Sequence, residues 1–245
     1  MIGLGLFCMA DNINQYTRQC QEGNITSCSD LGDIYFEQNN YAEAIKFYKQ
    51  ACAGQDGYSC NRVGYIYDKG LLSKVDSKKA LKFYQKAANL KDRWGYFNLA
   101  AEYRLGIAVK QDYDKAIAYY LKSCHAGAVD GCVELGDIYY NGEITKQNLA
   151  IAKEYYAIAC SMDDGYGCYS LGYMLEQGEG GQKSIKKAKE FYQKACDLKY
   201  EDGCEALVEI STDNEGSRRE VVIFSIFLMF IVAVRMFYFR KKKKL

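Results

Sequence analysis

The sequence has no proline in 245 residues, and it has one histidine and one tryptophan. Because proline breaks helices, its absence together with 14% aromatic residues favours long helices with a packed interior over a disordered chain. A single histidine, His125, makes a zinc site or a metal-dependent hydrolase a poor expectation, and no cofactor is expected. The 32 basic and 31 acidic residues nearly cancel, so nothing indicates a nucleic-acid partner.

Cysteine, in contrast, is abundant. Ten of the eleven cysteines form pairs with seven residues between the two members, and these pairs are Cys20/Cys28, Cys52/Cys60, Cys124/Cys132, Cys160/Cys168 and Cys196/Cys204. The pairs recur at about 36 residues, with one step of double length, and Ala88 and Tyr96 stand where the missing pair would fall. A period of this length is typical of a solenoid, here of about five units between roughly residues 20 and 204.

Regularly paired cysteines serve as disulfides, as metal ligands or as small core residues. Zinc sites usually bring two cysteines two to four residues apart, which does not fit this spacing. The first cysteine of each pair ends one predicted helix and the second begins the next, so a seven-residue connection that turns the chain back would bring both within the Cα distance of a disulfide. Disulfides are therefore favoured, and they predict an oxidising compartment.

Each unit has the pattern of a helical hairpin. Apolar residues recur at helical spacing in 132–141 and again in 148–160, with glycine and polar residues between the two segments. A glycine also stands inside the first helix at the same phase in four units, at Gly32, Gly64, Gly136 and Gly172. Glycine is unfavourable within a helix, so this recurrence predicts a close approach of a neighbouring helix.

The pattern L-G-x-x-Y, as in Leu31-Gly32 with Tyr35, and the pattern K-A-x-x-F-Y-x-K-A, as in residues 79–87 and 187–195, resemble the Sel1-like branch of the tetratricopeptide repeats. Ala100 and Leu175 depart from this pattern. The resemblance implies an all-α fold, a right-handed α/α solenoid of about five hairpins with inter-helix disulfides. The cysteine pairs resemble those of the Helicobacter cysteine-rich proteins, a likeness that implies penicillin binding and β-lactamase activity.

The two ends of the chain differ from the repeats in composition. Residues 1–10 form a short apolar leader, 11–210 the solenoid and 211–220 a polar linker. Residues 221–239 are almost all apolar and would span about 28 Å as a helix, which predicts a transmembrane helix in a lipid bilayer. The basic tail 240–245 predicts a cytoplasmic C-terminus, with the repeats in the periplasm or outside the cell.

The sequence contains no catalytic constellation. Ser184 and Lys187 have the S-x-x-K form of a serine β-lactamase, but Ser184 also stands where a helix N-cap is expected, and neither S-D-N nor K-T-G occurs. The enzyme hypothesis therefore depends on the resemblance alone. A third hypothesis is a membrane adaptor for protein assembly or degradation.

Binding is the better-supported hypothesis. In hairpin solenoids the first helix of each hairpin lines the concave face. The residues expected there are Ser29, Asp33, Phe36, Asn61, Tyr65, Asp68, Phe97, Ala101, Arg104, Val133, Asp137, Tyr140, Tyr169, Tyr173 and Glu176. Aromatic rings mixed with carboxylates would suit a peptide, glycopeptide or protein ligand of a monomeric solenoid. Asn24, in an N-x-T sequence, is a candidate glycosylation site.

Overall fold

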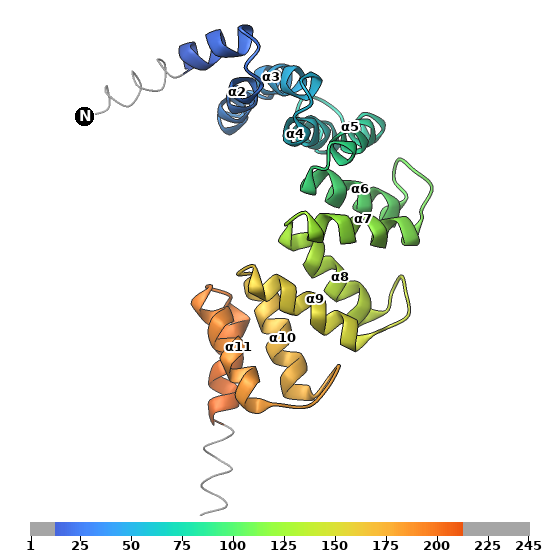
Figure 1. The fold of residues 1–245 in the computed structure, drawn as a ribbon, viewed down its shortest axis with the longest axis vertical. Helices are drawn as coiled ribbons and strands as arrows, with labels where there is room; N and C mark the ends of the chain where they lie inside the picture. The colour runs from blue at the N-terminus through green and yellow to red at the C-terminus, as the bar shows by residue number, and fades with distance from the viewer. Residues whose placement is uncertain (1–12, 213–245) are drawn as a thin grey trace, which may run out of the picture. The chain divides into compact units, whose positions relative to one another are not determined.

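The computed structural model describes residues 13–212, and in this range the chain is helical (Figure 1). Helices at 13–21 and 201–212 precede and follow five antiparallel hairpins. The hairpins are α2 (Ile25–Glu37) with α3 (Tyr41–Ala53), α4 (Gly57–Asp68) with α5 (Ser77–Asn89), α6 (Arg93–Leu105) with α7 (Tyr113–His125), α8 (Val129–Asn141) with α9 (Leu149–Ser161), and α10 (Gly165–Gln177) with α11 (Ile185–Asp197). We call the first helix of each hairpin helix A and the second helix B.

The chain divides into two compact units, Met1–Ala159 and Cys160–Leu245. In the first unit, each helix from α3 to α7 packs against the helix before it and the helix after it, which is the arrangement of a solenoid (Figure 1). In the second unit, α10 packs against α11. The predicted all-α fold of stacked hairpins is therefore confirmed, and the two segments expected at 132–141 and 148–160 are α8 and α9.

Most helices begin at a side-chain N-cap. The caps are Asn24, Asn40, Asp56, Asp76, Asp92, Asp112, Asn148, Asp164 and Ser184, and each accepts a hydrogen bond from a backbone N–H in the first turn. Such caps satisfy backbone donors that the helix itself leaves unpaired. In α8 the cap position holds Ala128, which makes no such bond.

The glycine inside helix A leaves room for an aromatic ring. A Cβ on Gly136 would lie 2.5 Å from the ring of Tyr156, and a Cβ on Gly64 would lie 2.6 Å from the ring of Tyr84. The tyrosine of helix B thus passes directly beneath the backbone of helix A. The close approach predicted from the recurring glycines is present, and it is an approach of a tyrosine ring.

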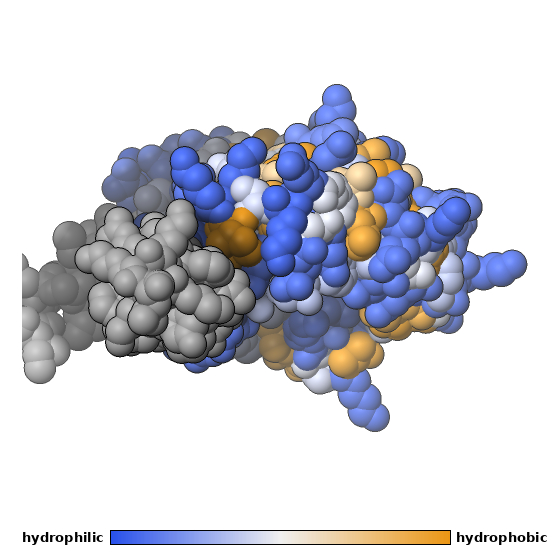
Figure 2. Space-filling model, turned by 90° about the horizontal axis from the view of Figure 1, so that it is seen from below, coloured by the Kyte–Doolittle hydropathy of each residue, from blue (hydrophilic) through white to orange (hydrophobic). Residues whose placement is uncertain are grey.

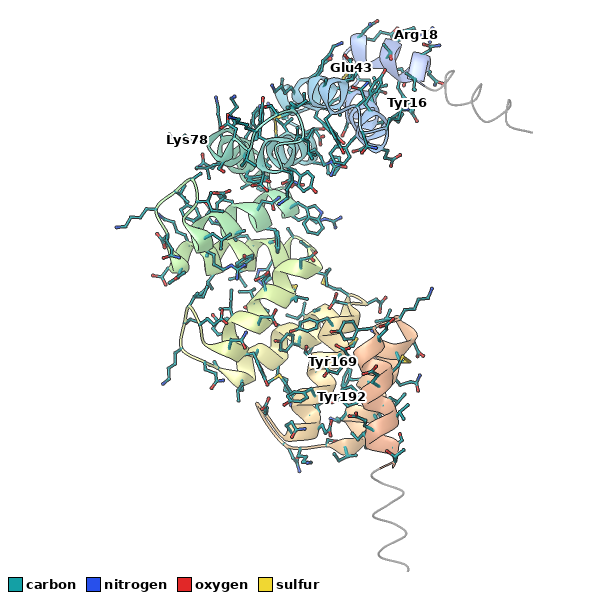
Figure 3. The ribbon with its side chains drawn as sticks, turned by 180° about the vertical axis from the view of Figure 1, so that it is seen from behind. Tyr16, Arg18, Glu43, Lys78, Tyr169 and Tyr192 are labelled. Carbon is teal, nitrogen blue, oxygen red and sulfur yellow. A yellow bond between two sulfur atoms is a disulfide. The ribbon has the colours of Figure 1, made fainter. Side chains whose placement is uncertain are left out.

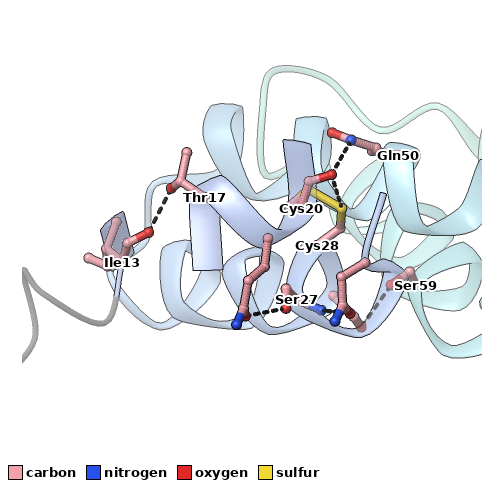
Figure 4. The surroundings of a disulfide bond; sticks show 10 residues. Ile13, Thr17, Cys20, Ser27, Cys28, Gln50 and Ser59 are labelled. Carbon is pink, nitrogen blue, oxygen red and sulfur yellow. Dashed lines mark hydrogen bonds between the residues drawn. A yellow bond between two sulfur atoms is a disulfide. The ribbon is translucent and has the colours of Figure 1, made fainter. Parts of the chain in front are cut away.

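All five cysteine pairs form disulfides, with Cα atoms 4.4–4.8 Å apart. The predicted pairing of neighbours in sequence is therefore confirmed, and each bridge joins two consecutive helices near the turn between them. Around the first bridge, Gln50 of α3 donates a hydrogen bond of 3.2 Å to the carbonyl oxygen of Cys20 (Figure 4). The carbonyl group of Cys20, next to this bridge, is thus hydrogen-bonded to α3.

The connection beneath each bridge is shorter than predicted. The second cysteine was expected to begin its helix, but Cys204 stands within the closing helix 201–212, and Cys60 stands three residues after the start of α4 at Gly57. Only residues 198–200 and 54–56 separate the helices at these joints, instead of seven residues. The helix can begin early because Asp56 caps α4 before the cysteine is reached. Each bridge therefore links two helices rather than the ends of a loop.

The last bridge differs from the other four in its burial. Cys196 of α11 and Cys204 have Cα atoms 4.6 Å apart, and both cysteines are only half-buried. The cysteines of the other four bridges are at most 5% exposed. The joint at Cys204 is thus less buried than the other bridged joints. Its helix, 201–212, is the last one that the structure describes, so no further hairpin within the described residues covers the bridge.

The joint between α5 and α6 has no bridge. Ala88 is 5% exposed, and Tyr96 stacks against Tyr119 with ring centroids 6.3 Å apart. The helices still approach closely, since a Cβ on Gly95 would lie 2.5 Å from the Cβ of Ala87. At a bridged joint, a Cβ on Gly203 would lie equally close to that of Ala195. This joint is held by packing alone, and we expect the array to open most easily there.

The joint between α5 and α6 should be able to form a sixth disulfide. We expect the double variant Ala88→Cys with Tyr96→Cys to form a disulfide, because its backbone geometry repeats that of the bridged joints. By the loop-entropy model the gain is about 2 kcal/mol, since the loss of the Tyr96 ring offsets part of it. Thiol counting and urea unfolding would measure this. Two free thiols in the air-oxidised variant would show that the joint differs in geometry from the other five.

Glu102 of α6 is a buried carboxylate at a position that holds isoleucine or methionine in the other hairpins. It is 4% exposed and accepts a 3.2 Å hydrogen bond from the backbone N–H of Ala108 in the following loop. Burial raises the pKa of Glu102, and the Asp68 charge raises it further. A carboxyl group whose pKa is raised in the folded state makes the folded chain less stable as pH rises through that pKa.

We therefore expect Glu102→Gln to be more stable than the original chain at pH 7, with the difference shrinking towards pH 4. Glutamine keeps the acceptor for Ala108 and removes the buried charge. Urea unfolding at several pH values measures the effect. A variant that is less stable at pH 7 would show that the loop stabilises the ionised carboxylate.

The prediction of a transmembrane helix is corrected. No helix within residues 13–212 is long and apolar enough to cross a membrane. The proposed span 221–239 lies outside the described residues, as do the leader 1–10 and the tail 240–245. The structure thus provides no membrane helix, and the predictions of a single-pass membrane protein and of a lipid-bilayer partner are not supported.

Candidate binding face

The residues expected on the concave face occupy three equivalent positions in each helix A. Counting from the cysteine position of helix A (Cys28, Cys60, Tyr96, Cys132 and Cys168), they stand one, five and eight residues later. We call the surface formed by these positions the A-face. It runs along α2, α4, α6 and α8 in the first unit, and a separate part lies on α10 in the second unit.

Beneath the A-face, each helix B carries a buried tyrosine four residues before its cysteine position. These tyrosines are at most 2% exposed, and they are Tyr48, Tyr84, Tyr120, Tyr156 and Tyr192. Three of them donate a hydrogen bond to a carboxylate of helix A in the same hairpin: Tyr48 to Asp33 at 2.5 Å, Tyr156 to Asp137 at 2.6 Å and Tyr192 to Glu176 at 2.7 Å. Three of the four acids predicted on the A-face are thus held in place from below.

Asp33 is the centre of a polar and aromatic cluster between the first two hairpins. Its Oδ1 also accepts a 2.7 Å hydrogen bond from the Tyr58 hydroxyl, and it lies 3.9 Å from Nε of Arg62. The guanidinium of Arg62 lies 3.9 Å from the ring centroid of Phe36 and donates from Nε to Tyr48 at 3.2 Å. Burial, and then the hydrogen bond to Asp33, raise the pKa of the Tyr48 hydroxyl, so it remains a donor at neutral pH.

In the second hairpin, one of the predicted binding residues is buried and the other two are accessible. Asn61 is buried, and its side-chain oxygen accepts a 2.7 Å hydrogen bond from Asn98 of α6. Asp68 pairs with Lys69 at 2.9 Å. Tyr65 is partly exposed and lies beside Phe36, with ring centroids 6.2 Å apart. Tyr65 and Asp68 therefore remain available to a ligand, whereas Asn61 serves the contact between hairpins.

In the third hairpin the acid is absent. Ala101 and Arg104 occupy the positions that hold Asp33 and Phe36 in the first hairpin. The Phe97 ring packs edge-on against Tyr120, with centroids 5.5 Å apart. Burial raises the pKa of Tyr120 to about 12. This hydroxyl is thus buried beneath the A-face without the carboxylate that Tyr48 has.

In the second unit, aromatic residues dominate. Tyr169 of α10 lies between Tyr192 of α11 and Tyr200, with ring centroids 5.7 and 5.5 Å away (Figure 3). Tyr173 is 38% exposed, and Glu176 accepts from Tyr192. Tyr173 is therefore the most accessible of the predicted binding residues on α10.

Two other predicted residues act at helix starts. Ser184 is the N-cap of α11, and its Oγ accepts from the backbone N–H of Lys187 at 3.4 Å. Asn24 is exposed, and its side-chain oxygen caps α2 by accepting from the N–H of Ser27 at 3.0 Å. The structural role expected for Ser184 is confirmed, and glycosylation of Asn24 stays a prediction.

Sequence reasoning missed the buried tyrosines and the partners from neighbouring elements. These partners are Arg62 and Tyr58 beside Asp33, and Glu134, which lies 3.8 Å from Arg104. The tyrosines had a signal in the sequence, because one stands four residues before every first cysteine position. Their periodicity marks them equally well as ordinary core residues, so only the structure shows that their hydroxyls reach the acids.

Two tyrosine variants compare the contribution to stability of a hydroxyl that donates a hydrogen bond with that of a hydroxyl that does not. We expect Tyr156→Phe to lose about 1–3 kcal/mol of unfolding free energy, because it removes a hydrogen bond to the Asp137 carboxylate. Tyr120→Phe should be neutral or stabilising, since it removes a buried hydroxyl that makes no hydrogen bond within the described chain. Urea unfolding measures both, and equal losses would contradict the assignment.

Comparison with known proteins agrees with the repeat geometry. The model of the Sel1 repeat matches residues 57–92, 95–127, 129–164 and 165–200, and that of the tetratricopeptide repeat matches 26–53. A curated relative, the HRD3 component of an ERAD-associated E3 ubiquitin-protein ligase from Candida glabrata, is 34% identical over 64 residues, which are 26% of this chain and 8% of the relative. This chain therefore spans only a small part of that protein.

Two solved structures are also similar. The c5321 protective antigen of uropathogenic Escherichia coli has 24% identity and a TM-score of 0.73, over 80% of this chain and 43% of the antigen, which shows a shared fold. Helicobacter pylori cysteine rich protein B has 36% identity and a TM-score of 0.43, over 54% of this chain and 98% of that protein. Because the Sel1 repeat matches together cover more than half of the sequence, the chain belongs to the Sel1 repeat family.

Proposed function

We propose that this chain is a protein-binding module that holds an extended segment of a partner protein, or a glycopeptide, on its A-face. The observation that carries the proposal is the repeated placement of a carboxylate over a buried tyrosine, at Asp33, Asp137 and Glu176. Hydroxyl groups fix the orientation of these carboxylates, so a ligand does not have to order them. Preorganised groups of this kind reduce the cost of binding.

The character of the surface agrees with polar recognition. On the face seen in Figure 2, apolar residues form small patches separated by hydrophilic side chains. The guanidinium of Arg62 lies 5.8 Å from the ring centroid of Tyr65, and the exposed Tyr173 stands three residues before Glu176 in α10. Aromatic rings supply contact area with little loss of side-chain freedom, and carboxylates accept hydrogen bonds from backbone N–H groups. A polypeptide segment offers both kinds of contact.

The relatives support the same class of function. The HRD3 relative is by name a component of an E3 ubiquitin-protein ligase, which is an assembly of proteins. The β-lactamase hypothesis has no comparable support, because the Ser184 hydroxyl is engaged in capping α11. Hydrolysis of nitrocefin by the oxidised chain at a rate above that of a reduced and unfolded control would support the β-lactamase hypothesis.

A displayed library of random peptides, selected on the oxidised full chain, tests the proposal. Selected peptides should bind at least about tenfold more weakly to the double variant Tyr65→Ser with Asp68→Asn, which loses one ring and one charge from the A-face. The matched control is Lys82→Ser with Gln85→Ser, which changes exposed residues of helix B in the same hairpin. Peptides that bind the control variant more weakly than the original chain, but bind the A-face variant as tightly as the original chain, would refute the proposal.

A further inference from the structure

The third hairpin contains two buried hydrogen-bond donors without an acceptor. The Tyr120 hydroxyl and Nε of Arg104 are both buried, and Arg104 lies close enough to lower the pKa of Tyr120, partly opposing the effect of burial. No hydrogen bond of acceptable geometry joins these two atoms or pairs either of them with another described residue. Tyr120 is fully buried. Buried polar groups are nearly always paired, so two unpaired donors in one hairpin indicate that a group is missing there.

Three of the other four hairpins indicate what kind of group is missing. A carboxylate five residues after the cysteine position of helix A accepts from the buried tyrosine in two hairpins, as Asp33 and Asp137. In the second unit, Glu176 does so from the eighth position. In α6 these two positions hold Ala101 and Arg104. The third hairpin has thus lost the acceptor and gained a cation.

The nearest acid of the described chain does not supply the acceptor. Glu134 of α8 lies 3.8 Å from Nη1 of Arg104, which is beyond hydrogen-bond distance. Arg104 and Glu134 are 34% and 28% exposed at their side chains, so this loose ion pair lies at the surface above Tyr120. Such a pair contributes little to stability and is easily exchanged for a better one.

We propose that Arg104 and Tyr120 bind a carboxylate of the ligand, which takes the place that Asp33 and Asp137 fill in their own hairpins. Arg104 donates from its guanidinium and Tyr120 from its hydroxyl, while Glu134 competes for Arg104. Phe97, in contact with Tyr120 and with Trp94 at a centroid distance of 5.9 Å, forms the apolar wall beside this carboxylate site. The inference rests on the proposed function, and it adds that the bound polypeptide is acidic at this point.

Either an acidic side chain or the C-terminus of the partner could supply the carboxylate. Three probes separate them: N-acetyl-aspartate N-methylamide carries a side-chain carboxylate, N-acetyl-alanine a terminal one, and N-acetyl-asparagine N-methylamide neither. The Nε–H resonance of Arg104 reports binding directly, and Trp94 is the only tryptophan of the chain and reports it by fluorescence. We expect a saturable shift with at least one carboxylate probe and none with the asparagine probe.

Variants establish which groups hold the carboxylate. Tyr120→Phe should weaken binding of the carboxylate probe about tenfold, because one hydrogen bond to a charged group is lost. Glu134→Gln should strengthen binding. Tyr119→Phe, which removes a hydroxyl from the adjacent residue of α7, should leave the affinity unchanged. Full affinity in Tyr120→Phe, or an Arg104 resonance that no carboxylate probe moves, would overturn the site.

The peptide library keeps this result separate from the proposed function. Peptides that bind through the A-face with no excess of acidic residues, together with an unresponsive Arg104, would overturn the carboxylate site and leave the binding module intact. Enrichment of Asp, Glu or a free C-terminus that is lost when selection is repeated on Tyr120→Phe would support the site.

Discussion

Reduction of the five disulfides should remove most of the stability of the folded chain. Each bridge closes a short loop between two helices, and the Cα atoms of its two cysteines lie 4.4–4.8 Å apart. The loop-entropy model gives about 2.5 kcal/mol for each bridge of this length. Five such contributions are comparable with the whole free energy of unfolding of an ordinary domain, about 5–15 kcal/mol. Circular dichroism during urea unfolding, with and without reductant, measures the loss.

Single joints provide the control for this experiment. The double variant Cys52→Ser with Cys60→Ser should lose about 2.5 kcal/mol under oxidising conditions. Its further loss on reduction should be smaller than that of the original chain by about the same amount. If reduction leaves the unfolding midpoint unchanged, packing alone holds the hairpins together, and the stabilising role of the bridges is refuted.

A large side chain at the glycine inside helix A should cost about as much stability as the loss of one bridge. In Gly136→Leu the new Cβ would lie 2.5 Å from the ring of Tyr156, which is 2% exposed and has no space into which to move. Overpacking of this kind costs about 3 kcal/mol or more where both groups are buried. Gly136→Ala should cost less, because the third hairpin accommodates Ala100 opposite Tyr120.

A double-mutant cycle identifies the ring as the cause. Tyr156→Ala alone is destabilising, since it leaves a cavity and removes the hydrogen bond to Asp137. Combined with Gly136→Leu, the leucine would fill part of that cavity, so the double variant should be more stable than the sum of the single losses predicts. Strictly additive losses in urea unfolding would mean that the glycine serves another purpose.

The sequence predicts the hairpins and the pairing of the cysteines well because their signals are local. A fixed period, helical spacing and seven residues between cysteines all describe one hairpin and its joint. The hydroxyl of Tyr48 meets Asp33 across 15 residues, and Arg62 reaches both from the next hairpin. The contact between Tyr48 and Asp33 depends on which sides of α2 and α3 face each other, and the contact with Arg62 depends on how hairpins stack. Residue spacing along the chain describes neither. The residues expected on the A-face were therefore predicted without their partners from neighbouring elements.

The joints illustrate the same limit. The spacing of Cys196 and Cys204 predicts their bridge, but it does not show that the closing helix begins at residue 201, nor that this bridge is less buried than the others. Helix starts depend on caps, and burial depends on which helices follow. Neither property is contained in the distance between two cysteines along the chain.

The burial of Glu102 was not predicted from the sequence, and the prediction of a transmembrane helix is not supported by the structure. Glu102 is buried at an apolar position because the loop after α6 presents the N–H of Ala108 to it. The apolar run at 221–239 shows only that those side chains avoid water, and a hydropathy pattern does not by itself establish a membrane helix. No such helix occurs in the described part of the chain, residues 13–212.

Most departures from the repeat lie in one hairpin. In α6–α7 and its preceding joint, the cysteine pair, the glycine inside helix A and the carboxylate of the A-face are replaced by Ala88 with Tyr96, Ala100, and Ala101 with Arg104. The hairpin that differs most from its neighbours is also the one with unpaired buried donors. This coincidence supports a role for α6–α7 in recognition.

The central claim is that a partner polypeptide binds along the A-face. The most direct test is the amide spectrum of the ¹⁵N-labelled, oxidised chain with and without a library-selected peptide. The account predicts shift changes concentrated at the A-face positions of α2, α4, α6 and α8, including Tyr65 and Arg104. Changes confined to exposed residues of the B helices, such as Lys82 and Gln85, would contradict it.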